Sequence, residues 1–111
     1  MNEQDFEQAW NKAMRRVEAR FDQPMDLQSL LYVIGVNELG QGPRRFNKDQ
    51  KIDVMHVAVC SLLEPYGYYQ FVGKDKEGWP HFERTERLPK LGAAEQEKLM
   101  KEAVLSYIQE W

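Results

Sequence analysis

The stretch DVMHVAVCSLLEPYGYYQFVG, residues 53–73, changes its hydrophobic period halfway along, which predicts a helix followed by a strand. Its first half is apolar over most of a helical circumference, which is typical of a central helix or of one covered by a second layer. The segment 64–67, EPYG, ends that helix, because proline restricts the residue before it and glycine favours a turn. The second half is aromatic and β-branched, which predicts a strand.

The central helix is predicted to run from Lys48 to Glu64. Asn47 and Gln50 have the spacing of a capping box at its start. On a helical wheel, one arc is expected to face the core and consists of Ile52, Met55, Val59, Leu62 and Leu63. Two further valines fall outside that arc, Val54 and Val57.

A β-hairpin is predicted after this helix. The runs YYQFVG (68–73) and WPHFERTE (79–86) are separated by KDKEG (74–78), which ends in glycine. Pro80 has no backbone donor and would confine its strand to an edge. Alternation places Tyr69 and Phe71 on one face, and Tyr68 and Val72 on the other, so both faces are apolar.

Three more amphipathic helices are predicted, within residues 6–21, from Asp26 to Gly40, and from Ala93 to Glu110. Gly35 lies inside the second of them, which indicates close approach of another backbone, and Gly40 is placed to end it. We therefore expect an α+β fold that is mainly helical. It has four helices and one antiparallel β-hairpin inserted before the C-terminal helix, within a single globular domain spanning residues 1–111.

The composition excludes several classes of protein. The net charge of −3 argues against wide, non-specific binding of nucleic acid, which requires a basic face. Cys60 is the only cysteine, so a disulfide within the chain and a cysteine-rich metal site are excluded. The acidic N-terminus and the absence of a long apolar run predict a soluble, cytoplasmic protein without a membrane segment. No residue pattern calls for a cofactor.

The loop ELGQGPRRFNKDQK, residues 38–51, places cations at a helix start, where free N–H groups favour an anion. It lacks the frame of a phosphate-binding P-loop and that of a dinucleotide-binding turn. We interpret it first as a connector. The second interpretation is a site for an anion or an acidic partner, formed by Arg44, Arg45 and Lys48.

Two weaker hypotheses concern metals and DNA. Asp49, Asp53 and His56 follow one side of the central helix, and carboxylates with an imidazole are suitable ligands for a divalent metal in a metal-dependent enzyme. Three helices followed by a hairpin resemble a winged helix-turn-helix domain in element order, which implies a DNA-binding regulatory protein. The apolar centre of the third helix argues against base reading, because it offers few basic or amide side chains.

The leading hypothesis is a non-catalytic protein-interaction module that acts as a homodimer or an adapter. The aromatic content of the hairpin exceeds what one core contact requires, and aromatic residues are enriched at interface centres. The predicted interface comprises Tyr68, Val72, Trp79, Val54 and Val57. We assign no catalytic residue, since no serine has the setting of a nucleophile and Cys60 is expected to be buried and inert.

Overall fold

The structure is a computed structural model that describes residues 2–42, 44–109 and 111. Within these residues the predicted fold is confirmed: four helices and a two-stranded antiparallel hairpin placed before the last helix. The elements are α1 (Glu3–Phe21), α2 (Leu27–Leu39), α3 (Lys48–Leu63), a 3₁₀ turn (Glu64–Tyr66), β1 (Tyr69–Lys74), β2 (Pro80–Arg84) and α4 (Ala93–Tyr107). The helix predicted to reach Glu110 ends earlier, and Glu110 lies outside the described residues.

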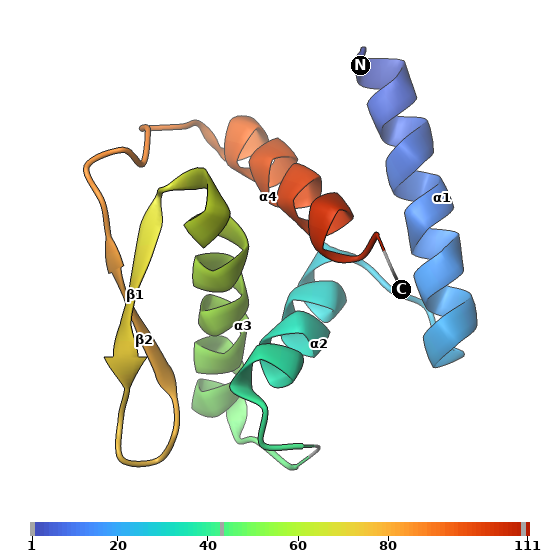
Figure 1. Ribbon diagram of the computed structural model, residues 1–111. Helices are drawn as coiled ribbons and strands as arrows, with labels where there is room; N and C mark the ends of the chain where they lie inside the picture. Colours follow the sequence, from blue (N-terminus) through green and yellow to red (C-terminus); the bar gives the residue numbers. More distant parts are fainter. Residues whose placement is uncertain (1, 43, 110) are drawn as a thin grey trace.

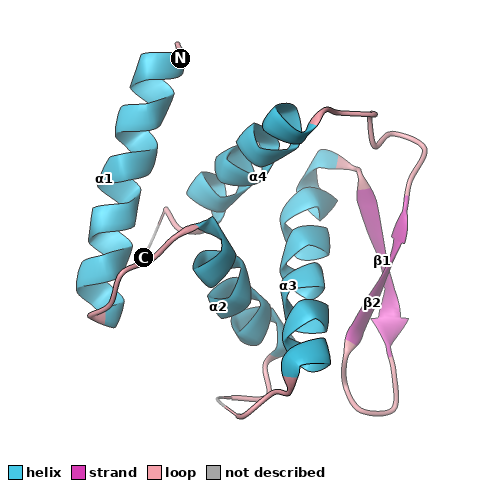
Figure 2. Cartoon of the chain, turned by 180° about the vertical axis from the view of Figure 1, so that it is seen from behind, coloured by secondary structure: helices cyan, strands magenta, loops and turns pink. Residues whose placement is uncertain are grey.

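The elements form three layers (Figures 1 and 2). α1 stands at one side of the molecule and the hairpin at the other, with α2, α3 and α4 between them. α3 is the central element and contacts α2, α4 and both strands. No helix in the described part of the chain is both long enough and apolar enough to cross a lipid bilayer.

Side-chain caps begin α2 and α3 where the sequence predicts them. The Asp26 carboxylate accepts a hydrogen bond from Ser29 N at 2.8 Å at the start of α2. Asn47 and Gln50 form the predicted capping box of α3. Gln50 N donates to Asn47 Oδ1 at 2.8 Å, and Asn47 N donates to Gln50 Oε1 at 3.0 Å. Each cap satisfies an N–H that the first helical turn leaves without a partner.

α2 and α3 pack closely because Gly35 has no side chain. A Cβ at residue 35 would lie 2.7 Å from Val54 Cγ1, so only hydrogen fits at this crossing. The predicted backbone approach is therefore confirmed. Gly40 then ends α2 in a left-handed conformation (φ 70°), which glycine adopts without strain, and its N–H donates to Val36 O.

The predicted core arc of α3 is partly wrong. Ile52 was expected in the core and is 59% exposed, whereas Val54 and Val57, expected outside the arc, are 0% and 5% exposed. α2 packs against α3 at Val54, and the hairpin covers the side that carries Val57. Because α3 is apolar around most of its circumference, periodicity alone could not identify which arc its neighbours cover.

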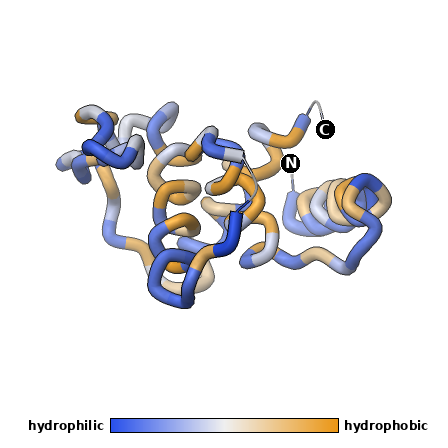
Figure 3. The backbone as a smooth tube through the Cα atoms, turned by 90° about the horizontal axis from the view of Figure 1, so that it is seen from below, coloured by the Kyte–Doolittle hydropathy of each residue, from blue (hydrophilic) through white to orange (hydrophobic). Residues whose placement is uncertain are grey.

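Two hydrophobic clusters hold the layers together, and Figure 3 shows apolar residues concentrated in the middle of the molecule. The larger cluster joins all four helices and includes Trp10, Val17, Leu30, Ile34, Val104 and Ile108. The smaller one consists of Leu39, Phe46 and Val54, with Tyr32, Val36 and Trp79 packed against it. Trp79 belongs to the hairpin, so this second cluster fixes the hairpin onto α2 and α3.

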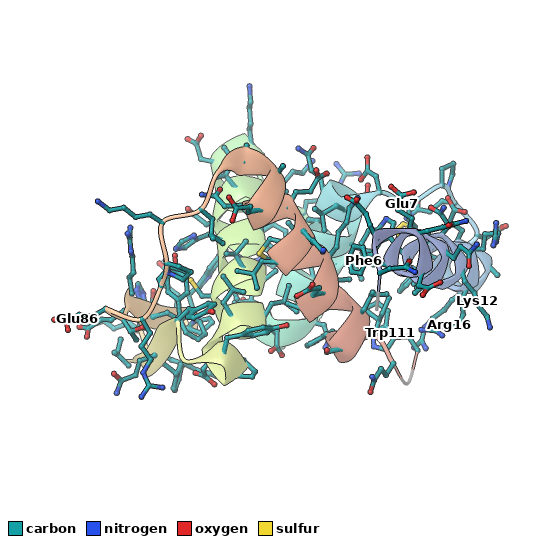
Figure 4. The ribbon with its side chains drawn as sticks, turned by 90° about the horizontal axis from the view of Figure 1, so that it is seen from above. Phe6, Glu7, Lys12, Arg16, Glu86 and Trp111 are labelled. Atoms are coloured by element: carbon teal, nitrogen blue, oxygen red, sulfur yellow. The ribbon has the colours of Figure 1, made fainter. Side chains whose placement is uncertain are left out.

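α1 is attached to the C-terminal segment by polar and aromatic contacts. Arg16 donates to Ile108 O at 2.9 Å, and the Trp111 ring meets the edge of Phe21 at 5.8 Å. The Lys101 ammonium lies over the Trp10 ring at 5.2 Å. In Figure 4, Trp111 lies beside α1 at the end of the chain, whereas Glu86 marks the opposite end of the molecule.

The hairpin is antiparallel, with Phe71 opposite Phe82 and Gly73 opposite His81. Val72 is therefore an extra residue in β1, which forms a bulge. Gly73 follows it with φ 134°, a conformation that a residue with a Cβ rarely adopts. The bulge reverses the alternation of side chains beyond Phe71, so the simple two-face pattern predicted for this strand ends there.

Candidate functional site

A cleft of about 380 Å³ lies between α3 and the hairpin. Asp53, His56 and Cys60 line it from α3, and Phe82 lines it from β2. The loop between the strands closes one end with Glu77. None of the lining residues belongs to β1, so the cleft lies on the β2 side of the hairpin.

Asp75 organises the loop at the end of this cleft. Its Oδ1 accepts hydrogen bonds from Glu77 N at 2.9 Å and Trp79 N at 3.0 Å, and its Oδ2 lies 2.9 Å from His81 Nε2. The hydrogen bond to His81 and those from the two backbone N–H groups lower the pKa of the Asp75 carboxyl below its ordinary value. Asp75 therefore remains a carboxylate in mildly acidic solution and presents Trp79 and His81 at the cleft.

Cys60 and His56 form a pair on the floor of the cleft, with Sγ and Nε2 3.5 Å apart. Their spacing of four residues brings the side chains together along one side of α3. Cys60 is 1% exposed, and burial raises the pKa of its thiol to about 11. The thiol is neutral at physiological pH, and the pair lacks the thiolate that nucleophilic chemistry requires.

The metal hypothesis finds no support in the geometry. Asp49, Asp53 and His56 are all exposed on α3. In the ranges that the structure describes, no group of three or more histidine, cysteine, aspartate or glutamate side chains is placed to hold a metal ion. Helical spacing brings these three residues to one side of α3, but a metal also requires ligands that converge on a point.

The loop between α2 and α3 contacts the hairpin loop. Gln41 Nε2 donates to Glu77 O at 2.6 Å, and Arg44 donates to Gln41 Oε1 at 2.9 Å. The Arg44 guanidinium lies 4.8 Å from the centre of the Phe46 ring and 5.9 Å from that of Trp79. Arg44 thus has a structural role as a cation–π partner in the connection between the two loops.

The other residues of the predicted anion site lie apart from this contact. Arg45 and Lys48 are exposed, and Pro43, in the same loop, lies outside the described residues. Arg44 is exposed as well, and its guanidinium lies over the Phe46 and Trp79 rings. The anion site formed by Arg44, Arg45 and Lys48 stays a prediction.

The residues of the predicted protein interface differ in their exposure in the structure. Val54 and Val57 are buried and are thus unavailable to a partner. Trp79 is half-buried and packs its ring against Phe46, and Tyr68 is half-buried with its ring 5.7 Å from that of Tyr66. Val72 is the one member of the predicted set that is exposed, at 51%.

The predicted interface does not include three exposed apolar side chains, Phe71 (45%), Ile52 (59%) and Tyr66 (37%). Phe71 lies on the same face of β1 as Tyr69, which does pack on the core, yet Phe71 itself is exposed. Glycine and proline beside Tyr66 mark a turn, and turns lie at the surface. That signal was present for Tyr66; none distinguished Ile52 from its buried neighbours.

The hypothesis of a DNA-reading helix requires a helix with an open basic face. α3 is instead covered by α2, α4 and the hairpin. Its exposed positions carry charges of both signs together with an isoleucine, namely Lys48, Asp49, Lys51, Ile52, Asp53 and His56.

Comparison with known proteins gives no further guidance, since no protein-family model, no curated protein and no solved structure matches this chain.

Proposed function

We propose that this chain is a non-catalytic protein-interaction module that forms a homodimer through β1 of its hairpin. The observation that carries the proposal is the exposure of the large aromatic side chain of Phe71, at 45%; Val72, at 51%, follows it on the opposite face of the strand. An exposed apolar ring on a strand favours association, because its burial releases it from water. Neither residue contributes to the two clusters that form the core.

Phe71 is held in place before any partner arrives. Its ring meets Phe82 at 5.6 Å with the planes inclined at 64°, the edge-to-face arrangement that aromatic pairs prefer. Its backbone N–H donates to Glu64 Oε2 at 3.2 Å. A side chain fixed in this way loses little conformational entropy on binding, which increases affinity.

The same hydrogen bond determines how β1 would be used. The Glu64 carboxylate accepts a hydrogen bond from the outward N–H of Phe71, so a partner strand would have to displace the carboxylate in order to pair at this edge. Side-chain packing is therefore the favoured mode of contact on this side. The bulge at Val72 further interrupts the regular edge that strand pairing would need.

The surface around Phe71 suits contact between two copies. Phe71 borders two shallow hollows, one lined by Glu64, Glu86 and Arg87 and the other by Glu38 and Lys74. A two-fold interface brings the same patch of each protomer together and therefore requires self-complementarity. An apolar projection beside hollows that carry both signs of charge meets this requirement, since each phenyl group could enter a hollow of the other copy.

The molar mass in solution tests the proposal. Light scattering coupled to size exclusion, over a series of concentrations, should give twice the chain mass of 13.1 kDa for the unmodified protein. Phe71→Asp should return the mass to that of one chain, while circular dichroism confirms that the fold is kept. Ile52→Asp changes a more exposed apolar residue on α3 and serves as the matched control, with no change in mass expected.

The proposal fails if the unmodified protein has the mass of a single chain at every concentration. It also fails if Phe71→Asp remains dimeric, because the association would then use another surface. A dimer broken by Ile52→Asp instead would place the interface on α3.

A further inference from the structure

The outward edge of β2 differs from that of β1 in its backbone hydrogen bonding. Thr85 N donates to Tyr68 O at 3.0 Å, and Asp75 N donates to Trp79 O at 2.9 Å, so odd-numbered residues of this strand face β1. Alternation then directs the backbone groups of Phe82 and Arg84 outward, away from β1. In the described part of the chain, no side chain or loop accepts from these two N–H groups, unlike the Glu64 cap on β1.

The outward edge of β2 borders the cleft. Because the cleft is lined by β2 and α3 and by no residue of β1, it lies along the open side of the hairpin. A groove with a free strand edge as one wall and a helix as the other accepts an extended peptide, whose backbone extends the sheet and whose alternate side chains enter the groove. Five residues, Pro80–Arg84, set the length of the paired segment.

The lining of the cleft selects the chemistry of the peptide. The exposed carboxylates of Asp53 and Glu77 line the cleft, and no lysine or arginine is among the residues that line it within the described chain. The Asp75 carboxylate also lines the cleft but is already engaged by two backbone N–H groups and His81. Cys60, a buried thiol, and the Phe82 ring contribute uncharged surface to the cleft. Carboxylates at the rim and aromatic rings on the wall both favour a cationic side chain with an apolar stem.

We propose that the cleft between β2 and α3 binds an extended, basic segment of a partner protein, which adds as a strand to the free edge of β2. The cleft shares Pro80 and Phe82 with the hollow beside Phe71, but strand addition to β2 does not require a dimer. Pro80 has no N–H to offer, so the hydrogen bonds from β2 are confined to Phe82, which lines the cleft, and Arg84, which lies beyond the cleft lining on the same strand edge. Lysine or arginine at alternate positions would then direct their charges into the cleft.

The experiment uses the whole chain and a fluorescein-labelled hexapeptide of sequence Lys-Val-Arg-Val-Lys-Val, with Glu-Val-Glu-Val-Glu-Val as the matched acidic probe. Fluorescence anisotropy should show saturable binding of the basic probe that weakens as salt is added, and no binding of the acidic one. In an ¹⁵N spectrum, the amide signals of Phe82 and Arg84 should shift on titration.

Two forms of the basic probe, N-methylated either on the valine amides or on the lysine and arginine amides, test strand addition directly. Only one set of amides faces β2 in a paired strand, so one form should lose binding and the other should keep it. Loss with both forms, or with neither, would overturn strand addition.

Variants of the protein test the assignment of charge. Asp53→Asn combined with Glu77→Gln should weaken binding about tenfold, since two exposed carboxylate contacts are removed. Glu86→Gln, an exposed glutamate that does not line the cleft, should leave binding unchanged. Equal binding of the acidic probe, or shifts confined to residues outside β2 and α3, would overturn the proposal. The probe should also bind at protein concentrations at which light scattering gives the mass of one chain, so this test can succeed where the dimer fails.

Discussion

Gly35 of α2 and Val54 of α3 are in direct contact at the crossing of their helices. A methyl group at residue 35 would approach Val54 Cγ1 to 2.7 Å and the Val54 carbonyl oxygen more closely still. Val54 is fully buried and belongs to the cluster that also receives Trp79 of the hairpin. The spacing of these two helices therefore influences where the hairpin, and with it the cleft, is held.

Gly35→Ala is expected to lower the free energy of unfolding by about 1–3 kcal/mol, the usual cost of excess volume in a packed interior. Alanine favours a helix by about 1 kcal/mol over glycine, so a destabilised variant would show that the steric term dominates. Urea denaturation measures the change. Gly92→Ala is the matched control, because its Cβ would meet only Glu95 Oε1, at 3.7 Å. A Gly35→Ala protein as stable as the unmodified one would contradict the close crossing.

Much of the fold could be predicted from local patterns in the sequence. Capping residues such as Asn47, the break at Pro65 and the change of period after it are encoded in short segments, so element types and order were predicted correctly. Which side of α3 is covered depends on where α2, α4 and the hairpin dock, and those contacts join residues distant in sequence. For this reason Ile52 was assigned to the core, and Val57 to the surface, contrary to the structure.

The cleft was harder to predict than the fold. Asp53 and His56 were recognised as neighbours on α3, because helical spacing shows this directly. Their proximity to Glu77 and His81 depends on how the hairpin docks on α3, and no local pattern encodes that docking. The sequence therefore suggested a metal site on one helix, whereas the structure places two of its three residues, Asp53 and His56, along a cleft between a helix and a strand.

Asp75 is expected to make stability depend on pH. Its pKa is lowered in the folded chain, chiefly by the hydrogen bond with His81 and then by that from Trp79 N, so the unfolded chain binds the proton more readily. The contribution is present above the ordinary pKa of 3.8 and is lost as the pH falls through the lower folded-state value. Urea denaturation over a pH series should give a difference in the free energy of unfolding between Asp75→Asn and the unmodified protein. This difference should become smaller as the pH falls.

The partner residue supplies a check on that prediction. His81→Gln removes the largest cause of the lowered pKa, so the acid-dependent part of the stability should become smaller while Asp75 is retained. A difference between Asp75→Asn and the unmodified protein that stays constant down to the lowest pH would show that the charge of Asp75 contributes nothing to folding.

Cys60 is expected to react slowly with thiol reagents in the folded protein. The rise of its pKa from 9.0 to about 11 lowers the thiolate fraction about 100-fold at pH 8, before access to the buried sulfur is considered. Reaction with an aromatic disulfide, followed by absorbance, should be at least that much slower in buffer than in denaturant. Equal rates under the two conditions would mean that the thiol is exposed or activated, and would reopen a nucleophilic role for the pair with His56.

Arg44 and Arg45 are adjacent in sequence and are expected to differ in their effect on stability. The Arg44 guanidinium stacks on Phe46 at 4.8 Å and bonds to Gln41, which in turn bonds to the hairpin loop, so its loss weakens the connection between two loops. Because Arg44 is exposed, Arg44→Ala should lower the free energy of unfolding by only about 0.5–1 kcal/mol. Arg45→Ala, measured by the same urea denaturation, should be close to neutral. Equal losses from both substitutions would indicate a general effect of charge in this loop and would contradict the specific role assigned to the stacked guanidinium.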